Sequence, residues 1–210
     1  MEIRGVLLLL NSQDIKQDVK LLSDGRQKRL LTIQDEAYKK QIIMSEFLLR
    51  HMLKKFYGVI WEDVKILERR YGKPYIYGKN EYLKFNISHT DNAVICVISD
   101  DEIGVDIEKV EPVEYEKICR IFTIEEQTKI ISSDSLTMFY EVFTKKEAYT
   151  KMLGLGLNMP FNAFNVLDNM DDILKTLTIG DYMISISSRK INQNKIFLDV
   201  IKEDEIKLYE

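Results

Sequence analysis

Two acidic side chains stand two positions apart in the segment GVDIEK at positions 104–109. On a β-strand, alternate side chains share a face, so Asp106 and Glu108 would lie about 6–7 Å apart while Val105 and Ile107 point into a core. Neighbouring carboxylates repel each other, and a hard divalent cation such as Mg²⁺ removes that repulsion. Taken alone, the pattern is more often a half-buried strand with a solvated acidic face.

A second candidate lies in the sequence KKEAYTK at positions 145–151. On a helix, Glu147 and Lys151 are one turn apart and share a face. The carboxylate could bind a metal or act as a general base, and the ammonium could bind phosphate. Taken alone, a surface ion pair worth about 0.3–0.5 kcal/mol is the simpler interpretation.

Ser88 and His89 end a predicted strand and offer a hydroxyl and an imidazole to an anion. A hairpin turn is the simpler interpretation of this segment. A hydrolase triad is a poor alternative, because adjacent Ser and His side chains cannot easily adopt the required geometry and the chain has no nucleophile-elbow motif. The other histidine, His51, falls within a long helix and is assigned a structural role.

Basic residues form a further candidate group for phosphate contacts: Arg26, Lys28, Arg29 and Lys73. Taken singly, each is an ordinary solvated charge.

The elements that must position these residues follow from hydrophobic periodicity. Apolar residues recurring from Ile43 to Phe56 predict a helix that ends at Gly58. Thr123 and Glu126 have capping-box spacing, so another helix begins there, and a longer one covers 135–153. Strands are predicted at 1–10, 82–87, 93–99, 103–109, 173–177, 182–186 and 196–201, with a polar loop at 89–92. The two halves thus share an order of elements, which predicts an α+β fold with a boundary near 100–104.

The composition narrows the class of protein. The 210 residues are 45% hydrophobic and 30% charged, with a net charge of −4, which favours a globular protein that binds neither nucleic acid nor an anionic membrane. The two cysteines have neither disulfide nor zinc spacing, which suits a cytoplasmic setting. No apolar run approaches the length of about 20 residues needed to span a bilayer.

Four motifs occur together in one order: GKP at 72–74, FNISHT at 85–90, IGVDIEK at 103–109 and KEAYTK at 146–151. Together they resemble the 4′-phosphopantetheinyl transferase superfamily in its longer, surfactin-synthetase-activating form. Each motif is weak alone, whereas all four in this order are specific. With the chain length and the N-terminal basic cluster, the resemblance covers nearly the whole chain.

The resemblance implies two similar α/β lobes, residues 1–102 and 103–210, that form an intramolecular pseudo-dimer. Coenzyme A would lie in the cleft between them, and the protein would be a monomer. The implied reaction transfers the 4′-phosphopantetheine group from coenzyme A to a serine of an apo acyl- or peptidyl-carrier protein and releases 3′,5′-ADP.

Site residues carry over by motif position. Three carboxylates would hold Mg²⁺ against the pyrophosphate: Asp106, Glu108 and Glu147. Lys151 would contact that pyrophosphate, and Glu147, directly or through a metal-bound water, would take the serine proton. Other residues would contact coenzyme A: Ser88 and His89 at its phosphates, Lys73 near the adenine and ribose phosphate, and Arg26 and Arg29 at the 3′-phosphate.

Two departures from the family pattern are visible. Phe143 stands where the family usually has tryptophan, which keeps an aromatic packing residue. The third acidic ligand also varies within the family, so direct metal binding by Glu108 stays open. The segment 111–122, with Val113, Tyr115 and Ile118, is a candidate loop for docking a small acidic carrier protein, and core packing is the alternative role for these side chains.

Two other functions compete with this one. The same carboxylates could serve a different Mg²⁺-dependent phosphotransferase or nuclease, although the net negative charge and the missing P-loop count against it. A non-catalytic module could bind coenzyme A or a carrier protein without transfer, although the presence of Glu147 and Lys151 counts against that.

Overall fold

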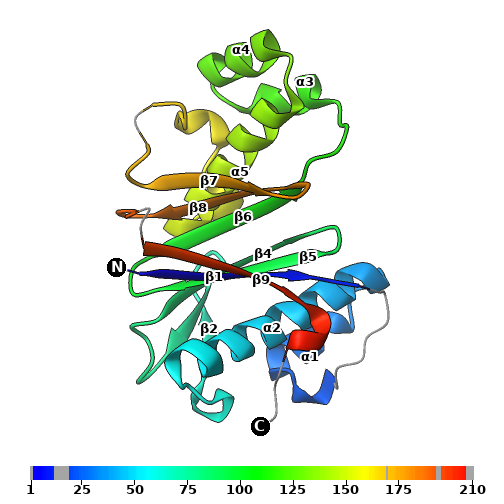
Figure 1. Ribbon diagram of the computed structural model, residues 1–210, viewed down its shortest axis with the longest axis vertical. Helices are drawn as coiled ribbons and strands as arrows, with labels where there is room; N and C mark the ends of the chain where they lie inside the picture. Colours follow the sequence, from blue (N-terminus) through cyan, green and yellow to red (C-terminus); the bar gives the residue numbers. More distant parts are fainter. Residues whose placement is uncertain (1, 12–18, 169, 193–194, 207–210) are drawn as a thin grey trace.

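Two main β-sheets stack face to face at the centre of the molecule, and helices cover the outer face of each sheet (Figure 1). The computed structural model describes residues 2–11, 19–168, 170–192 and 195–206. Apolar side chains from both sheets meet between them, among them Leu7, Ile95, Val105 and Ile184. The predicted α+β architecture with two lobes is therefore confirmed.

The first sheet has the order β4-β5-β1-β9 in the described part of the chain. β5 is buried along its whole length, as its continuous apolar sequence indicates. β1 pairs antiparallel with β5 and parallel with β9, and β4 pairs antiparallel with β5. The strands are β1 (Ile3–Leu9), β4 (Lys84–Thr90), β5 (Ala93–Ser99) and β9 (Ile196–Lys202).

The hairpin between β4 and β5 is tighter than the sequence indicated. Residues 89–92 were expected to form a polar loop, but the ladder continues to the pair Thr90↔Ala93. Asn92, the second residue of the turn, has a φ of 56°, the left-handed conformation that asparagine tolerates in turns. His89 and Thr90 are consequently strand residues with fixed directions.

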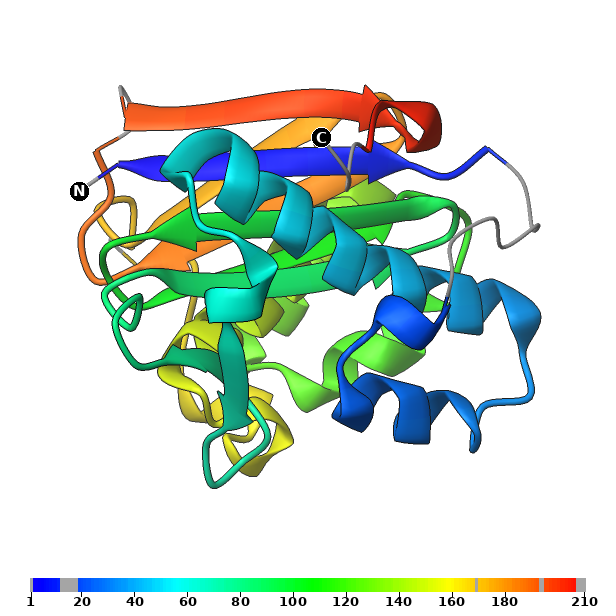
Figure 2. The ribbon, with the colours of Figure 1, turned by 90° about the horizontal axis from the view of Figure 1, so that it is seen from below.

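Helices of the first lobe pack on the outer face of this sheet. α2 carries the predicted apolar stripe, with Ile43, Phe47 and Met52 buried against the sheet. Its N-terminus is capped by Asp35, and Gly58 ends it with a φ of 64°. Figure 2 shows α2 crossing the strands, with α1 beside its N-terminal part. The elements are η1 (Val19–Leu21), α1 (Asp24–Leu30), α2 (Glu36–Tyr57), η2 (Trp61–Asp63) and the small hairpin β2 (Lys65–Glu68) and β3 (Pro74–Tyr77).

The second lobe has the antiparallel sheet β6-β8-β7 and its own covering helices. The predicted capping box is present, because Thr123 and Glu126 exchange side-chain-to-backbone hydrogen bonds at the start of α4. Its strands and helices are β6 (Ile103–Lys109), α3 (Tyr115–Ile118), η3 (Cys119–Ile121), α4 (Ile124–Ser133), α5 (Leu136–Leu153), η4 (Gly156–Asn158), η5 (Phe161–Ala163), β7 (Leu174–Ile179) and β8 (Tyr182–Ser188).

The last strand joins the lobes. β9 follows the second lobe in the chain but pairs with β1 of the first sheet, and η7 (Glu203–Glu205) follows it. Pairing with β9 covers the edge of β1, whose backbone N–H and C=O groups would otherwise be unpaired. β9 thus belongs to the first sheet although residues 103–210 were assigned to the second lobe, and the division after residue 102 stays a prediction.

A buried ion pair holds the helical layer of the second lobe together. The Nζ of Lys146 lies 2.7 Å from Glu126 Oε2, and both side chains are 0% exposed. The ammonium also donates to the carbonyl oxygens of Phe161 and Phe164. Lys146 is thus a core residue, although its motif also carries site candidates. No helix among the described residues combines the length and apolar character needed to cross a bilayer.

Candidate active site

Strands β4 and β6 run side by side where the two lobes meet. Val105 and Ile107 point into the core between the sheets, so the predicted shared face of Asp106 and Glu108 is confirmed. Alternate polar residues of β4 face β6 in matching register. Asn86 Oδ1 accepts from the backbone N–H of Val105 at 2.9 Å, Ser88 Oγ donates to Asp106 Oδ1 at 2.8 Å, and Thr90 Oγ1 donates to Glu108 Oε2 at 3.3 Å.

Helix α5 reaches this face of β6 because residue 104 is glycine. A Cβ at Gly104 would lie 2.0 Å from the carbonyl oxygen of Ala148 and 2.4 Å from the amide nitrogen of Met152, which no side chain tolerates. The two backbones are therefore in direct contact. This approach brings a residue in the last turn of α5 to the acidic face of the strand.

Lys151 makes that contact. Its Nζ lies 2.6 Å from Asp106 Oδ1 and 2.9 Å from Ser88 Oγ. Asp106 is 4% exposed and Lys151 is 26% exposed, so the ammonium sits at the boundary between the interior and solvent. The sequence suggested a surface ion pair between Lys151 and Glu147 on the same helix. In the structure, Lys151 of α5 instead forms an ion pair with Asp106 of β6.

The three predicted acidic residues influence one another electrostatically. Burial and the charge of Asp106 raise the pKa of Glu108 to about 7, and Glu147 adds to this effect. Burial also raises the pKa of Glu147, while Lys151 opposes the increase and Asp106 supports it. The site therefore accumulates negative charge in a poorly solvated place, which a cation would relieve.

The carboxylate oxygens of the site are ligands of the type that a hard cation binds. Asp106 Oδ2 is buried and has no hydrogen-bond partner among the described residues. Carboxylate oxygens are the ligands that Mg²⁺ prefers. However, no group of three or more His, Cys, Asp and Glu side chains in the described ranges has the arrangement of a metal site. Mg²⁺ binding by Asp106, Glu108 and Glu147 therefore stays a prediction.

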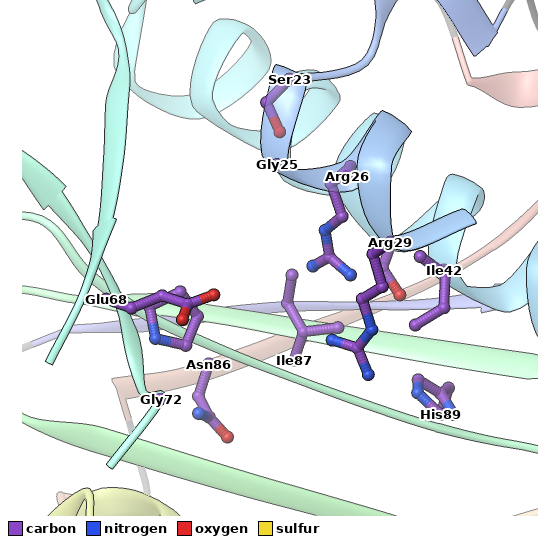
Figure 3. A pocket seen from close by; sticks show the side chains of 12 residues that line it. Ser23, Gly25, Arg26, Arg29, Ile42, Glu68, Gly72, Asn86, Ile87 and His89 are labelled. Atoms are coloured by element: carbon purple, nitrogen blue, oxygen red, sulfur yellow. The ribbon is translucent and has the colours of Figure 1, made fainter. Parts of the chain in front are cut away.

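A basic pocket of about 270 Å³ lies on the other face of β4 (Figure 3). Arg26 and Arg29 of α1 enter it from one side, and His89 lies at its β4 side. Neighbouring strand residues point to opposite faces, so Ser88 contacts Asp106 while His89 lines the pocket. The lining residues are Ser23, Gly25, Arg26, Arg29, Ile42, Ser45, Glu68, Gly72, Pro74, Asn86, Ile87 and His89.

The pKa of His89 depends on charged residues of both the pocket and the acidic face. Burial, the largest cause, and the charges of Lys151, Arg26 and Arg29 together lower the pKa of His89 from 6.5 to about 4. Tyr38 packs edge-on against the imidazole, with ring centroids 5.5 Å apart, and accepts a hydrogen bond from Arg29 Nη2 at 3.0 Å. Positive charge that depresses an imidazole pKa also attracts anions.

An anionic ligand should raise the pKa of His89 from about 4 toward its ordinary value of 6.5, because it offsets the neighbouring positive charges. Binding would then take up a proton, so affinity should increase as the pH falls between these two values. An NMR titration of the imidazole, with and without inorganic pyrophosphate, measures this shift. The resonance of His51 on α2 is the internal control, and an unchanged titration of His89 would contradict anion binding here.

Two basic candidates do not join this pocket. Lys28 lies on α1 beside Arg29 but lines a separate groove with Leu31 and Ile43. Lys73 stands between two lining residues, yet its ammonium donates to Glu102, to the carbonyl oxygen of Ile103 and to that of Met152. Arg26 does face the pocket, where burial lowers its pKa and Glu46 opposes that change.

Sequence reasoning did not single out Asn86, Glu102 or Gly104 as residues that organise the site. For Asn86 a signal existed, since polar residues alternate through 86–90 and alternate strand residues share a face. Phe143 packs in an aromatic cluster with Phe122, at a ring distance of 6.4 Å, and with Phe139 at 5.8 Å. The expectation that it serves as an aromatic packing residue is met.

Comparison with known protein families adds independent support. A family model described as "4'-phosphopantetheinyl transferase superfamily" matches residues 102–197. A second model, "4'-phosphopantetheinyl transferase, N-terminal", matches residues 11–102. The two matches meet at residue 102, close to where the first sheet's β5 gives way to β6.

Individual relatives agree with this assignment. The 4'-phosphopantetheinyl transferase Sfp of Bacillus subtilis is 26% identical over 176 residues, which is 81% of this chain and 78% of the relative. The 4'-phosphopantetheinyl transferase gsp of Aneurinibacillus migulanus is 31% identical over 140 residues, 65% of this chain and 56% of the relative. The L-aminoadipate-semialdehyde dehydrogenase-phosphopantetheinyl transferase of Xenopus laevis is 28% identical over 176 residues, 76% and 54% respectively. The two family models together span the chain from residue 11 to residue 197, and this protein belongs to the 4′-phosphopantetheinyl transferase superfamily.

Proposed function

We propose that this protein transfers the 4′-phosphopantetheine group from coenzyme A to a serine of an apo acyl- or peptidyl-carrier protein and releases 3′,5′-ADP. One observation carries the proposal. The Asp106–Lys151–Ser88 cluster lies on one face of β4, and a pocket with Arg26, Arg29 and His89 lies on the other. A molecule with a pyrophosphate and a separate phosphate monoester matches an acidic cluster that carries Lys151 and could hold a cation, next to a pocket with two arginines.

The basic pocket suits the 3′-phosphate of coenzyme A. Arg26 and Arg29 project from one short helix, and an arginine guanidinium forms strong charge-assisted hydrogen bonds with phosphate oxygens. His89 lies close enough to feel the charge of Lys151, so the pyrophosphate would lie between the pocket and the acidic cluster. The three internal acceptors of the Lys73 ammonium support a positioning role for that residue instead.

The chemistry is an in-line displacement at phosphorus. The serine oxygen of the carrier forms a bond to the β-phosphorus on the pantetheine side, and the bond from that phosphorus to 3′,5′-ADP breaks. Glu147 takes the serine proton, because burial raises its pKa toward that of an effective general base. Lys151 stabilises the negative charge that develops on the phosphoryl oxygens.

We propose that Asp106, Glu108 and Glu147 hold Mg²⁺. The ion would offset the charge of the pyrophosphate and of the leaving group. The unpartnered Oδ2 of Asp106 and the raised pKa of Glu108 support this assignment. Glu108 would either bind the ion directly or orient the residues around it. Thr90 of β4 donates a hydrogen bond to its carboxylate.

The partner would be a carrier protein, and the enzyme would act as a cytoplasmic monomer. Within the candidate docking segment 111–122, Val113, Ile118 and Ile121 are exposed. Tyr115 instead packs beside Phe139 and donates to Asp134. The segment thus offers both apolar surface for a partner and an anchor to the second lobe.

The decisive experiment is a mass assay on apo carrier proteins of fatty acid, polyketide and nonribosomal peptide systems, incubated with this protein, coenzyme A and Mg²⁺. The proposal expects the mass of at least one carrier to increase by one phosphopantetheine group, with release of 3′,5′-ADP. Cleavage of coenzyme A without a modified carrier would favour a different phosphotransferase. Binding of coenzyme A without any turnover would favour a non-catalytic module.

Replacing Arg29 with methionine should raise the KM for coenzyme A about 10- to 100-fold, because a hydrogen bond to a charged group contributes about 1.5–3 kcal/mol. The kcat should stay unchanged, since this contact is equally present in the ground state and the transition state. Lys28→Met is the matched control. It removes one positive charge from the neighbouring position of α1, but the Lys28 side chain lines a different groove. Equal effects of the two variants would contradict the pocket assignment.

A further inference from the structure

We propose that Lys73 is a positioning residue for the transfer reaction: its buried side chain fixes the C-terminus of α5 against the start of β6 and so sets the contact between Lys151 and Asp106. This inference rests on the proposed function for what Lys151 and Asp106 do. It differs from the coenzyme A contact that the family resemblance implies for Lys73.

The ammonium of Lys73 has no donor left for a ligand. It lies 3.0 Å from Glu102 Oε2, 3.0 Å from the carbonyl oxygen of Ile103 and 2.8 Å from that of Met152. A lysine ammonium has three N–H groups, and three internal acceptors use them. The side chain is 7% exposed, and burial lowers its pKa while the hydrogen bond to Glu102 opposes that change.

One of these bonds completes the C-terminus of α5. The last carbonyl groups of a helix have no partner within it. Thr150 and Lys151 bond through their carbonyl oxygens to the amides of Leu155 and Gly154, at 3.1 and 3.2 Å. The next carbonyl, that of Met152, accepts from Lys73 instead. A cation here is also favoured by the helix dipole.

The shape of this helix end fits the lysine stem. Gly154 ends α5 with a φ of 70°. A Cβ at Gly154 would lie 3.2 Å from Cδ of Lys73, so the stem packs directly over the glycine. Gly154 after α5 and Lys73 before β3 are therefore parts of one packing arrangement, although 81 positions separate them in the printed sequence.

The other two bonds hold the start of β6. Glu102 also accepts from Arg69 Nη2 at 2.5 Å, and the backbone of Arg69 bonds to the carbonyl oxygen of Lys73 at 2.9 Å. The turn that carries Lys73 is thus rigidly connected to the residue that precedes β6. Two positions after Glu102 is Gly104, where the backbones of β6 and α5 touch.

The anchored positions flank the catalytic pair. Met152 follows Lys151 directly, and Ile103 precedes Asp106 by three positions on the same strand. Lys73 therefore bridges the two elements whose side chains meet at 2.6 Å in the site. Without the bridge, α5 would be free to shift along β6, and a displacement of about 1 Å in an active site can cost about 100-fold in rate.

Lys73→Met keeps the stem and removes the ammonium, so it tests the proposal. The expected result is a fall in kcat of about 10- to 100-fold with an unchanged KM for coenzyme A. Lys79→Met is the matched control, because Lys79 is 65% exposed and pairs with Asp63 at the surface. A raised KM with an unchanged kcat would overturn the proposal and return Lys73 to coenzyme A binding.

A double variant separates positioning from general destabilisation. If Lys73 acts through Lys151, then Lys73→Met should reduce kcat much less in a Lys151→Met background than in the wild type. Equal fold-changes in both backgrounds would overturn the proposal. If Lys73→Met does not fold, Lys73→Arg is measured instead, and a normal kcat with a raised KM would again overturn it.

Hydrogen exchange provides a readout that does not depend on transfer activity. The amides of Gly154 and Leu155 should exchange faster in Lys73→Met than in the wild type or in Lys79→Met. Unchanged exchange would overturn the positioning role, whatever the activity. Faster exchange in Lys73→Met, together with a wild type that modifies no carrier, would support the positioning role and contradict the proposed function.

Discussion

Replacing Asp106 with asparagine should lower kcat/KM for phosphopantetheine transfer about 1,000-fold, because several kcal/mol of charge stabilisation would be lost and each 1.36 kcal/mol is a factor of ten. One oxygen of the Asp106 carboxylate, Oδ1, pairs with Lys151, and the other, the buried Oδ2, is suited to bind a cation. Asparagine has nearly the same shape, so it changes the charge and leaves the volume intact. Rates from the mass assay at saturating Mg²⁺ measure the effect.

The fold should survive this change. Lys151 is 26% exposed, so its ammonium can be solvated when Asp106 loses its charge. Circular dichroism and thermal unfolding check this point. Asp91→Asn is the matched control, because this aspartate lies in the exposed turn between β4 and β5. If Asp106→Asn kept the wild-type rate with Mg²⁺ present, the proposed role of the acidic face would be wrong.

Glu147→Gln should reduce kcat by about 10²- to 10⁴-fold, the range that a positioned general base contributes. Glutamine fills the same space but cannot take the serine proton. The pH dependence provides a second signature. Burial raises the pKa of Glu147, so wild-type activity should fall as the pH falls through that raised value and the carboxylate becomes protonated. The variant should lack this acidic limb in its profile of kcat against pH.

A control on the same helix isolates the effect. Glu141→Gln removes one carboxylate from α5, where Glu141 pairs with Lys145 at 2.6 Å, and it should leave kcat and the pH profile unchanged. If Glu147→Gln retained both the rate and the acidic limb, another group would be the base. Glu108, whose pKa is raised to about 7, would then be the next candidate.

Much of the fold followed from local patterns. The apolar stripe of α2, the capping box of α4 and the continuous apolar run of β5 each depend on residues close together in the sequence. The hairpin at 89–92 did not follow, because its polar residues suit both a loop and a short turn. The left-handed Asn92 decided between them, and it thereby placed His89 in a strand.

The position of β9 shows the same limit at a larger scale. Its apolar residues predicted a strand over 196–201, and a strand is present at Ile196–Lys202. No local signal indicated that it would pair with β1, nearly the whole chain away. Strand pairing depends on which edge is available in the folded molecule, and that is a property of the assembled sheets.

The sequence by itself determined which acidic residues share a face and which helical residues lie one turn apart, since these follow from the periods of 2 and 3.6 residues. Only the tertiary structure decided which cations serve the site. Lys146 and Lys73 are buried against internal acceptors, whereas Lys151 reaches Asp106. A long side chain takes its partner from whatever packs nearby, and here the close approach of α5 to Gly104 made that choice.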